Sequence, residues 1–272
     1  MSKPPLPLPN QQPSTLTIDI GQFLQEKQFE QDSPYNVFLN GQKSLIVMAN
    51  KDSESVANIQ LLTLGLSSLI EHYFRSIISK SIFLCRHSKD VALRNAQISL
   101  AAANYYKDVN LGRAIFDDVN FSDIKIIYAQ TSEYLNIKLK DAGDDVKTAL
   151  LDLQKIFVLR HAVVHANGFL SPRNLMELHS DNNLITAVST TYESFENMVA
   201  VALNSIQSYN SFVFSCLLKR AFQRKYIKFD NSESDVSEFA KYWILFLGAD
   251  TPESNITSSA SYEKAKQHYT SS

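Results

Sequence analysis

The chain has few of the residues on which several common protein classes depend. It contains only 7 glycines and 2 cysteines among 272 residues. No Gly-rich phosphate loop is present, which argues against a nucleotide-binding protein of that type. The two cysteines, Cys85 and Cys216, lie in separate apolar stretches. They fit small buried residues in a reducing compartment better than a disulfide framework.

Long apolar runs and a large net charge are also absent. No apolar run reaches the length of ~18 residues that a membrane-spanning helix needs. Prolines interrupt the N-terminal stretch where a signal peptide would have its apolar segment, at Pro4, Pro5, Pro7 and Pro9. The net charge of -2 argues against a protein that coats nucleic acid through bulk electrostatics. We therefore expect a cytoplasmic protein with no membrane contact, in which any contact with nucleic acid is local.

The first 50 residues form a tail and an extension. Residues 1–16 are rich in proline, glutamine and serine, which predicts a disordered or extended tail. A proline-rich ligand of SH3-type domains is the alternative for that tail. In residues 17–50, two short apolar runs between Tyr35 and Val47 flank Asn40-Gly41. That dipeptide between apolar runs predicts a β-hairpin.

Apolar residues spaced three or four apart predict one helical domain at residues 51–230. The first expected helix follows Asp52 or Ser53 as its cap, and the second and third cover residues 90–105 and 122–139. The fourth runs from Val146 towards Gly168, and the fifth is capped by Thr190 or Thr191 and extends to Lys228. Apolar runs within 176–188 predict a second small hairpin. Residues 231–272 follow as a short helix at 235–247 and a polar tail. The predicted fold class is all-α, an antiparallel helical bundle with minor β-hairpin decoration.

The most informative segment is the decapeptide from Leu159 to Gly168. It places Arg160, His161 and His165 at the end of an apolar helix, just before an Asn-Gly stop. Cationic side chains in such a position cost desolvation unless they have partners. A fixed guanidinium beside an imidazole that exchanges a proton near neutral pH suits the handling of phosphate groups.

Three interpretations of these residues remain open. His161 and His165 are four residues apart and could share a zinc ion, but Ala162 stands where a zincin helix has its glutamate. Alternatively, the cations only stabilise the negative end of the helix dipole. The third interpretation is phosphodiester cleavage. Arg160 and His165 lie ~140° apart on an ideal helix, so this interpretation needs two such helix ends or a distorted last turn.

The spacing of these residues resembles that of the HEPN superfamily, in which an arginine is followed after four to six residues by a histidine. Arg160 to His165 fits the pattern, with His161 as the polar residue that often follows the arginine. The run from Leu69 to Arg75 is similar to the first core helix of RiboL-PSP-HEPN and related defence families. There, Glu71 and Arg75 match an auxiliary glutamate-and-basic pattern, although a surface ion pair between them is the simpler interpretation.

The resemblance implies a HEPN-type bundle that forms a homodimer and cleaves RNA without a metal or cofactor, as a toxin or antiphage effector. An antitoxin or another defence protein would then be a partner. In this interpretation His165 takes the proton of the ribose 2′-hydroxyl, Arg160 stabilises phosphoryl charge, and His161 orients the substrate or shares the proton transfer. The alternative is a non-catalytic HEPN module that binds a nucleotide or a partner protein.

A basic run ends the last long helix of the predicted domain. It consists of Lys219, Arg220, Arg224, Lys225 and Lys228. Cations are expected at a helix C-terminus on dipole grounds, so a solvated basic end is one interpretation. The other is a weak RNA contact by the first four of these residues.

Overall fold

The computed structural model describes residues 18–26, 32–51, 55–107, 111–181, 184–248 and 256–270. The chain divides into two units, Met1–Glu30 and Gln31–Ser272. The described part of the first unit holds one short 3-10 helix, η1 (Ile20–Phe23), whose Gly21 amide donates a 3.1 Å hydrogen bond to the Asp19 carboxylate. The predicted tail at 1–16 lies outside the described residues.

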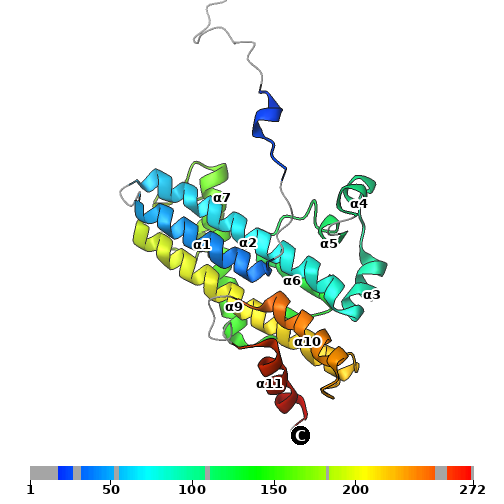
Figure 1. The fold of residues 1–272 in the computed structure, drawn as a ribbon. Helices are drawn as coiled ribbons and strands as arrows, with labels where there is room; N and C mark the ends of the chain where they lie inside the picture. The colour runs from blue at the N-terminus through cyan, green and yellow to red at the C-terminus, as the bar shows by residue number, and fades with distance from the viewer. Residues whose placement is uncertain are drawn as a thin grey trace, which may run out of the picture. The chain divides into compact units, whose positions relative to one another are not determined.

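The second unit confirms the predicted all-α class within its described residues (Figure 1). Its helices are α1 (Pro34–Lys51), α2 (Val56–Leu84), α3 (Arg86–Asn95), α4 (Leu100–Tyr106), α5 (Leu111–Ala114), α6 (Ile124–Leu135), η2 (Leu139–Asp141), α7 (Asp144–His165), α8 (Pro172–Glu177), α9 (Tyr192–Gln223), α10 (Glu233–Phe246) and α11 (Ser258–Thr270). The pairing of Phe169 with Ala187 is an isolated bridge outside any strand.

Four long helices, α1, α2, α7 and α9, pack against one another and form the bundle. Figure 1 shows α1 between α2 and α9 and running opposite to both. Helix α7 is antiparallel to α9. The Ser205 hydroxyl of α9 donates to the Ala149 carbonyl near the start of α7, and the end of α7 leads through α8 to the start of α9. The end of α7 therefore lies near the starts of α2 and α9, where the Gln60 side chain donates to the Val188 carbonyl.

The hairpin predicted between Tyr35 and Val47 is wrong, because this segment is part of helix α1. Its buried residues follow a helical period: Tyr35, Phe38, Leu39, Gln42 and Ala49. Gly41 serves close packing here and not a turn. A Cβ atom at this position would stand 2.6 Å from the Leu69 side chain of α2. The periodicity and the contact with α2 outweigh the local Asn-Gly signal.

The second predicted hairpin, within 176–188, is also wrong. Met176 belongs to helix α8, which begins with Pro172 behind a capping box formed by Ser171 and Asn174. The expected polar C-terminal tail contains a further helix, α11. Tyr262 of α11 donates a 2.7 Å hydrogen bond to Asp235 of α10 and anchors α11 there. The helix expected at 90–105 is divided into α3 and α4.

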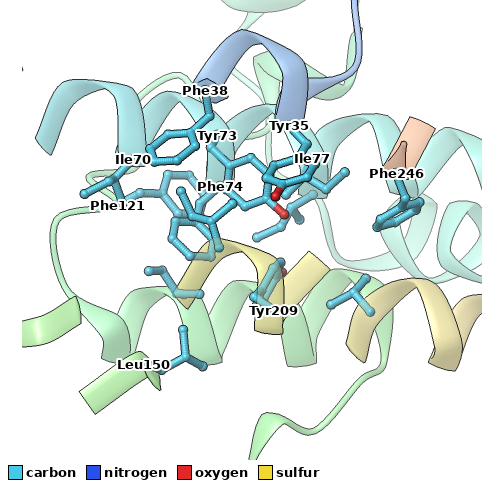
Figure 2. Close-up of a cluster of buried hydrophobic side chains, with 14 of the residues drawn as sticks. Tyr35, Phe38, Ile70, Tyr73, Phe74, Ile77, Phe121, Leu150, Tyr209 and Phe246 are labelled. Carbon is cyan, nitrogen blue, oxygen red and sulfur yellow. The ribbon is translucent and has the colours of Figure 1, made fainter. Parts of the chain in front are cut away.

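Aromatic residues from several helices form the core (Figure 2). Tyr73 and Phe74 of α2 meet Tyr209 of α9 edge to face. Two of the buried hydroxyls have partners: Tyr73 donates to Asn210 at 2.9 Å, and Tyr209 lies 2.8 Å from the Thr131 hydroxyl. Because these two groups are hydrogen-bonded, Tyr73 and Tyr209 are buried at little cost in desolvation. The core thereby fixes α2 and α9, which flank α7.

Candidate catalytic site at the end of helix α7

Helix α7 ends where the sequence predicts. The amides of Ala166 and Gly168 both donate to the Ala162 carbonyl, at 3.0 and 2.9 Å. Asn167 and Gly168 take left-handed backbone angles, with φ of 49° and 85°. These residues satisfy carbonyls that the last helical turn would leave without partners. The turn fixes the position of His165, the last residue of the helix.

The three predicted site residues divide between two environments. Arg160 is half-buried, whereas His161 and His165 are exposed. The two imidazole rings lie beside each other, with centroids 4.7 Å apart and planes tilted by 48°. An exposed pair of imidazoles at this distance can approach one bound phosphodiester together. Such a pair suits proton transfer, in which one ring accepts a proton and the other donates one.

Glu71 of α2 is the electrostatic partner of Arg160 across the helix interface. Burial raises the pKa of this half-buried carboxyl, and the positive charges of Arg160 and Arg75 oppose the rise. The sequence singles out Glu71 and Arg75 as a pair on one helix. The structure adds Arg160, which lies on another helix that packs against α2. No spacing within the sequence could reveal that neighbour.

Arg75 has mainly structural contacts. Its guanidinium donates a 2.7 Å hydrogen bond to the Val119 carbonyl and lies 5.7 Å from the ring centroid of Phe121. Burial, and then the nearby charge of Arg113, lower the pKa of Arg75, while Glu71 opposes the shift. This half-buried arrangement differs from the exposed ion pair that is the simpler interpretation of the sequence. Arg75 fixes the loop before α6 beside Glu71.

Replacing Glu71 with glutamine is expected to lower activity at the site by about 10-fold or more, because Arg160 loses its counter-charge. The same change is expected to leave the melting temperature equal or slightly higher at neutral pH. A carboxyl whose folded-state pKa is raised binds its proton more tightly in the folded protein, so the free energy of unfolding falls as pH rises through that pKa. Thermal melts from pH 4 to 8 should show this fall in the wild type and less of it in Glu71→Gln. A melting temperature that drops at all pH values would contradict the functional role.

The zinc interpretation finds no third ligand. Among the described residues, no group of three or more His, Cys, Asp or Glu side chains is arranged to hold a metal ion. Protein zinc sites take three or four protein ligands, and the His161/His165 pair supplies two.

The predicted RNA-contact run has two kinds of residue. Lys219, Arg224 and Lys225 are exposed. Arg220 instead donates to the carbonyls of Leu135 and Asn136, at 2.7 and 2.9 Å, where helix α6 ends. Its guanidinium thereby supplies hydrogen bonds to carbonyls at the helix C-terminus that have no partner within the helix. Arg220 thus has a structural role that the sequence does not reveal.

An apolar hollow lies directly after helix α7, and the sequence gives no sign of it. Its volume is about 410 Å³. It is lined by Phe169, Leu170, Pro172, Leu175, Met176, Ser180, Leu184 and Ile185. Large apolar side chains are strongly exposed there, including Met176 at 69% and Ile185 at 93%. Exposed apolar clusters of this kind commonly mark contact surfaces.

Comparisons with known proteins add no relative. No family model, no curated protein and no solved structure matches this chain. Within the described residues, no helix is both long enough and apolar enough to cross a membrane. Function is therefore inferred from the side chains at the end of α7 and from their surroundings.

Proposed function

We propose that this protein is a metal-independent endoribonuclease of the HEPN type, acting as a toxin or antiphage effector. One observation carries the proposal. Arg160 is half-buried beside Glu71 of the neighbouring helix, while the exposed imidazoles of His161 and His165 lie 4.7 Å apart on the same helix end. The arrangement combines a fixed positive charge with two imidazoles that lie close enough together to act on one substrate.

The chemistry follows from these groups. His165 accepts the proton of a ribose 2′-hydroxyl, and the 2′-oxygen attacks the adjacent phosphorus. Arg160 stabilises the negative charge that grows on the phosphoryl oxygens. The bond from phosphorus to the 5′-oxygen breaks, and a protonated imidazole supplies the proton that this leaving oxygen requires. His161, or a histidine from a second copy, serves as that acid.

A homodimer is part of the proposal. Arg160 is half-buried while the imidazoles are exposed, and two copies of this helix end would surround one phosphodiester more completely than one copy. The apolar hollow after α7 adjoins the motif and offers surface for such a contact. Light scattering of the purified protein at micromolar concentration is expected to report a dimer. A monomer with full cleavage activity would contradict the composite site.

The test of the proposed function is cleavage of RNA by the purified full-length protein in excess EDTA, with His165→Ala as the matched control. Cleavage by the wild type and its loss in the variant would support the proposal, because imidazoles need no metal to transfer protons. Cleavage that stops in EDTA and returns with a divalent ion would contradict it. RNA that is bound and left uncut under all conditions would contradict it as well.

A further inference from the structure

Helix α2 ends and α3 begins at the end of α2 that lies away from the proposed site (Figure 1). A second group of cations lies there. Arg86, His87 and Arg94 of α3 and Arg224 at the end of α9 form this group, which we call the α3–α9 basic surface. Its three arginines are exposed, and His87 is half-buried. The sequence places these residues in two separate segments, and the fold brings them together.

Contacts between the end of α9 and the start of α3 bring these cations together: the Arg86 guanidinium lies 5.2 Å from the Tyr226 ring centroid, and Arg220 donates to the Ser88 hydroxyl. Burial lowers the pKa of His87, and the positive charges of Arg224, Arg220 and Arg94 lower it further, while Asp90 opposes the shift. Asn136, at the end of α6, lies 3.2 Å from the His87 ring. A histidine that is influenced by three arginines and only one carboxylate stands in a positive local potential.

The three exposed arginines of this surface have no carboxylate partner within the part of the chain that the structure describes. The ion pairs found there involve Lys147, Lys155, Arg173 and Lys241 instead. Arg86 lies over the Tyr226 ring, 5.2 Å from its centroid, and the Arg94 Nε donates to the Asp90 carbonyl. These guanidiniums therefore keep donors available to an external anion.

Helix electrostatics account for only part of this cluster. Arg224 follows α9 and Arg94 stands in the last turn of α3, and a cation is favourable in both places. Helix α3, by contrast, begins with Arg86 and His87 and has no acidic residue in its first turn. Cations at a helix N-terminus oppose the dipole and cost stability, so α3 gains nothing from them by itself. An external anion would remove this unfavourable arrangement.

We propose that the α3–α9 basic surface binds the phosphodiester backbone of single-stranded RNA. This inference rests on the proposed function, because it adds a docking surface for the same substrate. Guanidiniums match phosphate geometry, and Tyr226 provides an aromatic ring beside them. A membrane surface is a less suitable partner, because helices that bind membranes insert several large apolar side chains. In α3, Leu93 is the one large apolar side chain that is strongly exposed.

The position of this surface sets a length for the RNA. Glu71 stands at the level of the proposed site on α2, and Cys85 follows the end of that helix, next to α3. Cys85 lies 14 positions after Glu71, which corresponds to ~21 Å along a helix axis. An RNA strand that reaches both places must therefore extend several nucleotides beyond the scissile bond.

The test measures RNA binding separately from cleavage. Full-length His165→Ala protein in EDTA is titrated against a fluorescent single-stranded RNA of about 20 nucleotides, a length above the usual range of single-strand sites. Adding Arg94→Gln and Arg224→Gln is expected to weaken binding by about 10-fold near 0.1 M salt, and to reduce the slope of log affinity against log salt by about 1.4. The matched control adds Lys125→Gln and Lys147→Gln, which remove the same charge at the starts of α6 and α7. Melting curves verify that both variants fold.

The outcomes separate this proposal from the nuclease proposal. If the arginine variant binds RNA as tightly as the control does, the surface proposal is overturned, whatever the wild type cleaves. If the arginine variant loses binding while the wild type cleaves nothing, the surface proposal stands and the nuclease proposal falls. Vesicles of anionic lipid and poly-glutamate serve as competitors. Binding of either one as tightly as RNA, with the same dependence on the two arginines, would overturn the assignment to RNA.

Discussion

Expression of the wild-type protein is expected to arrest cell growth, and alanine in place of Arg160 or of His165 is expected to abolish that arrest. Removing a general base typically lowers the rate by roughly 10²- to 10⁴-fold. Removing a group that stabilises phosphoryl charge lowers it by about 10²- to 10³-fold. Cleavage of a fluorescent RNA by purified variants measures these losses, and colony counts after induction measure the effect in cells. His165→Ala is expected to retain the stability of the wild type, because its side chain is exposed at a helix end.

The controls for this experiment lie close to the motif. Arg173→Ala removes an exposed cation of α8 whose partner is Glu177, and it should leave both toxicity and cleavage unchanged. Arg160→Lys keeps the charge and loses the planar fork, so an intermediate rate is expected. Arg160→Ala leaves the half-buried Glu71 without one of its two arginines, so its melting temperature must be measured beside its activity. Two folded alanine variants that remain as toxic as the wild type would refute catalysis at this motif.

Periodicity within a segment made much of the bundle predictable. The apolar spacing of α2 and α9 reflects burial on one face, and the Asn167-Gly168 stop of α7 reflects backbone angles that those residues adopt readily. Helix α1 could not be predicted in this way. Its Asn40-Gly41 pair is a turn signal in isolation, and the reason for Gly41 is the Leu69 side chain of another helix. Helix α11 is equally dependent on tertiary contact, because it is polar and is anchored through Tyr262 and Asp235.

The candidate site was also predictable only in the parts that a single segment of the sequence determines. Arg160, His161 and His165 could be selected from the sequence, because three cationic side chains at one helix end call for an explanation. The counter-charge on Arg160 could not, since Glu71 reaches it only when α2 packs against α7. Arg220 is the opposite case. It belongs to a basic run in the sequence, yet its guanidinium completes the end of α6. Only the hydrogen-bond partners seen in the structure distinguish cations that stabilise the fold from cations that could bind a ligand.

RNA fragments made by this protein are expected to end in a 2′,3′-cyclic phosphate, and the following fragments to begin with a free 5′-hydroxyl. These ends arise because the attacking oxygen belongs to the ribose, so the new bond closes a ring on the upstream nucleotide. An RNA methylated at the 2′-oxygen of the scissile nucleotide, and the corresponding DNA, lack the nucleophile. Both should resist cleavage by about 10³-fold or more, because general base catalysis has no proton to remove.

Product analysis tests the mechanism more directly than loss of activity does, because it identifies the nucleophile. Mass spectrometry distinguishes the cyclic phosphate from a linear one, and a kinase that requires a 5′-hydroxyl labels the downstream fragment without prior dephosphorylation. EDTA should change neither the ends nor the rate, since Arg160 and the imidazoles supply the charge stabilisation and the proton transfer that metal ions provide in other nucleases. Fragments with a 5′-phosphate would show that water or hydroxide attacked the phosphorus. Together with dependence on a divalent ion, they would restore His161 and His165 as candidate metal ligands.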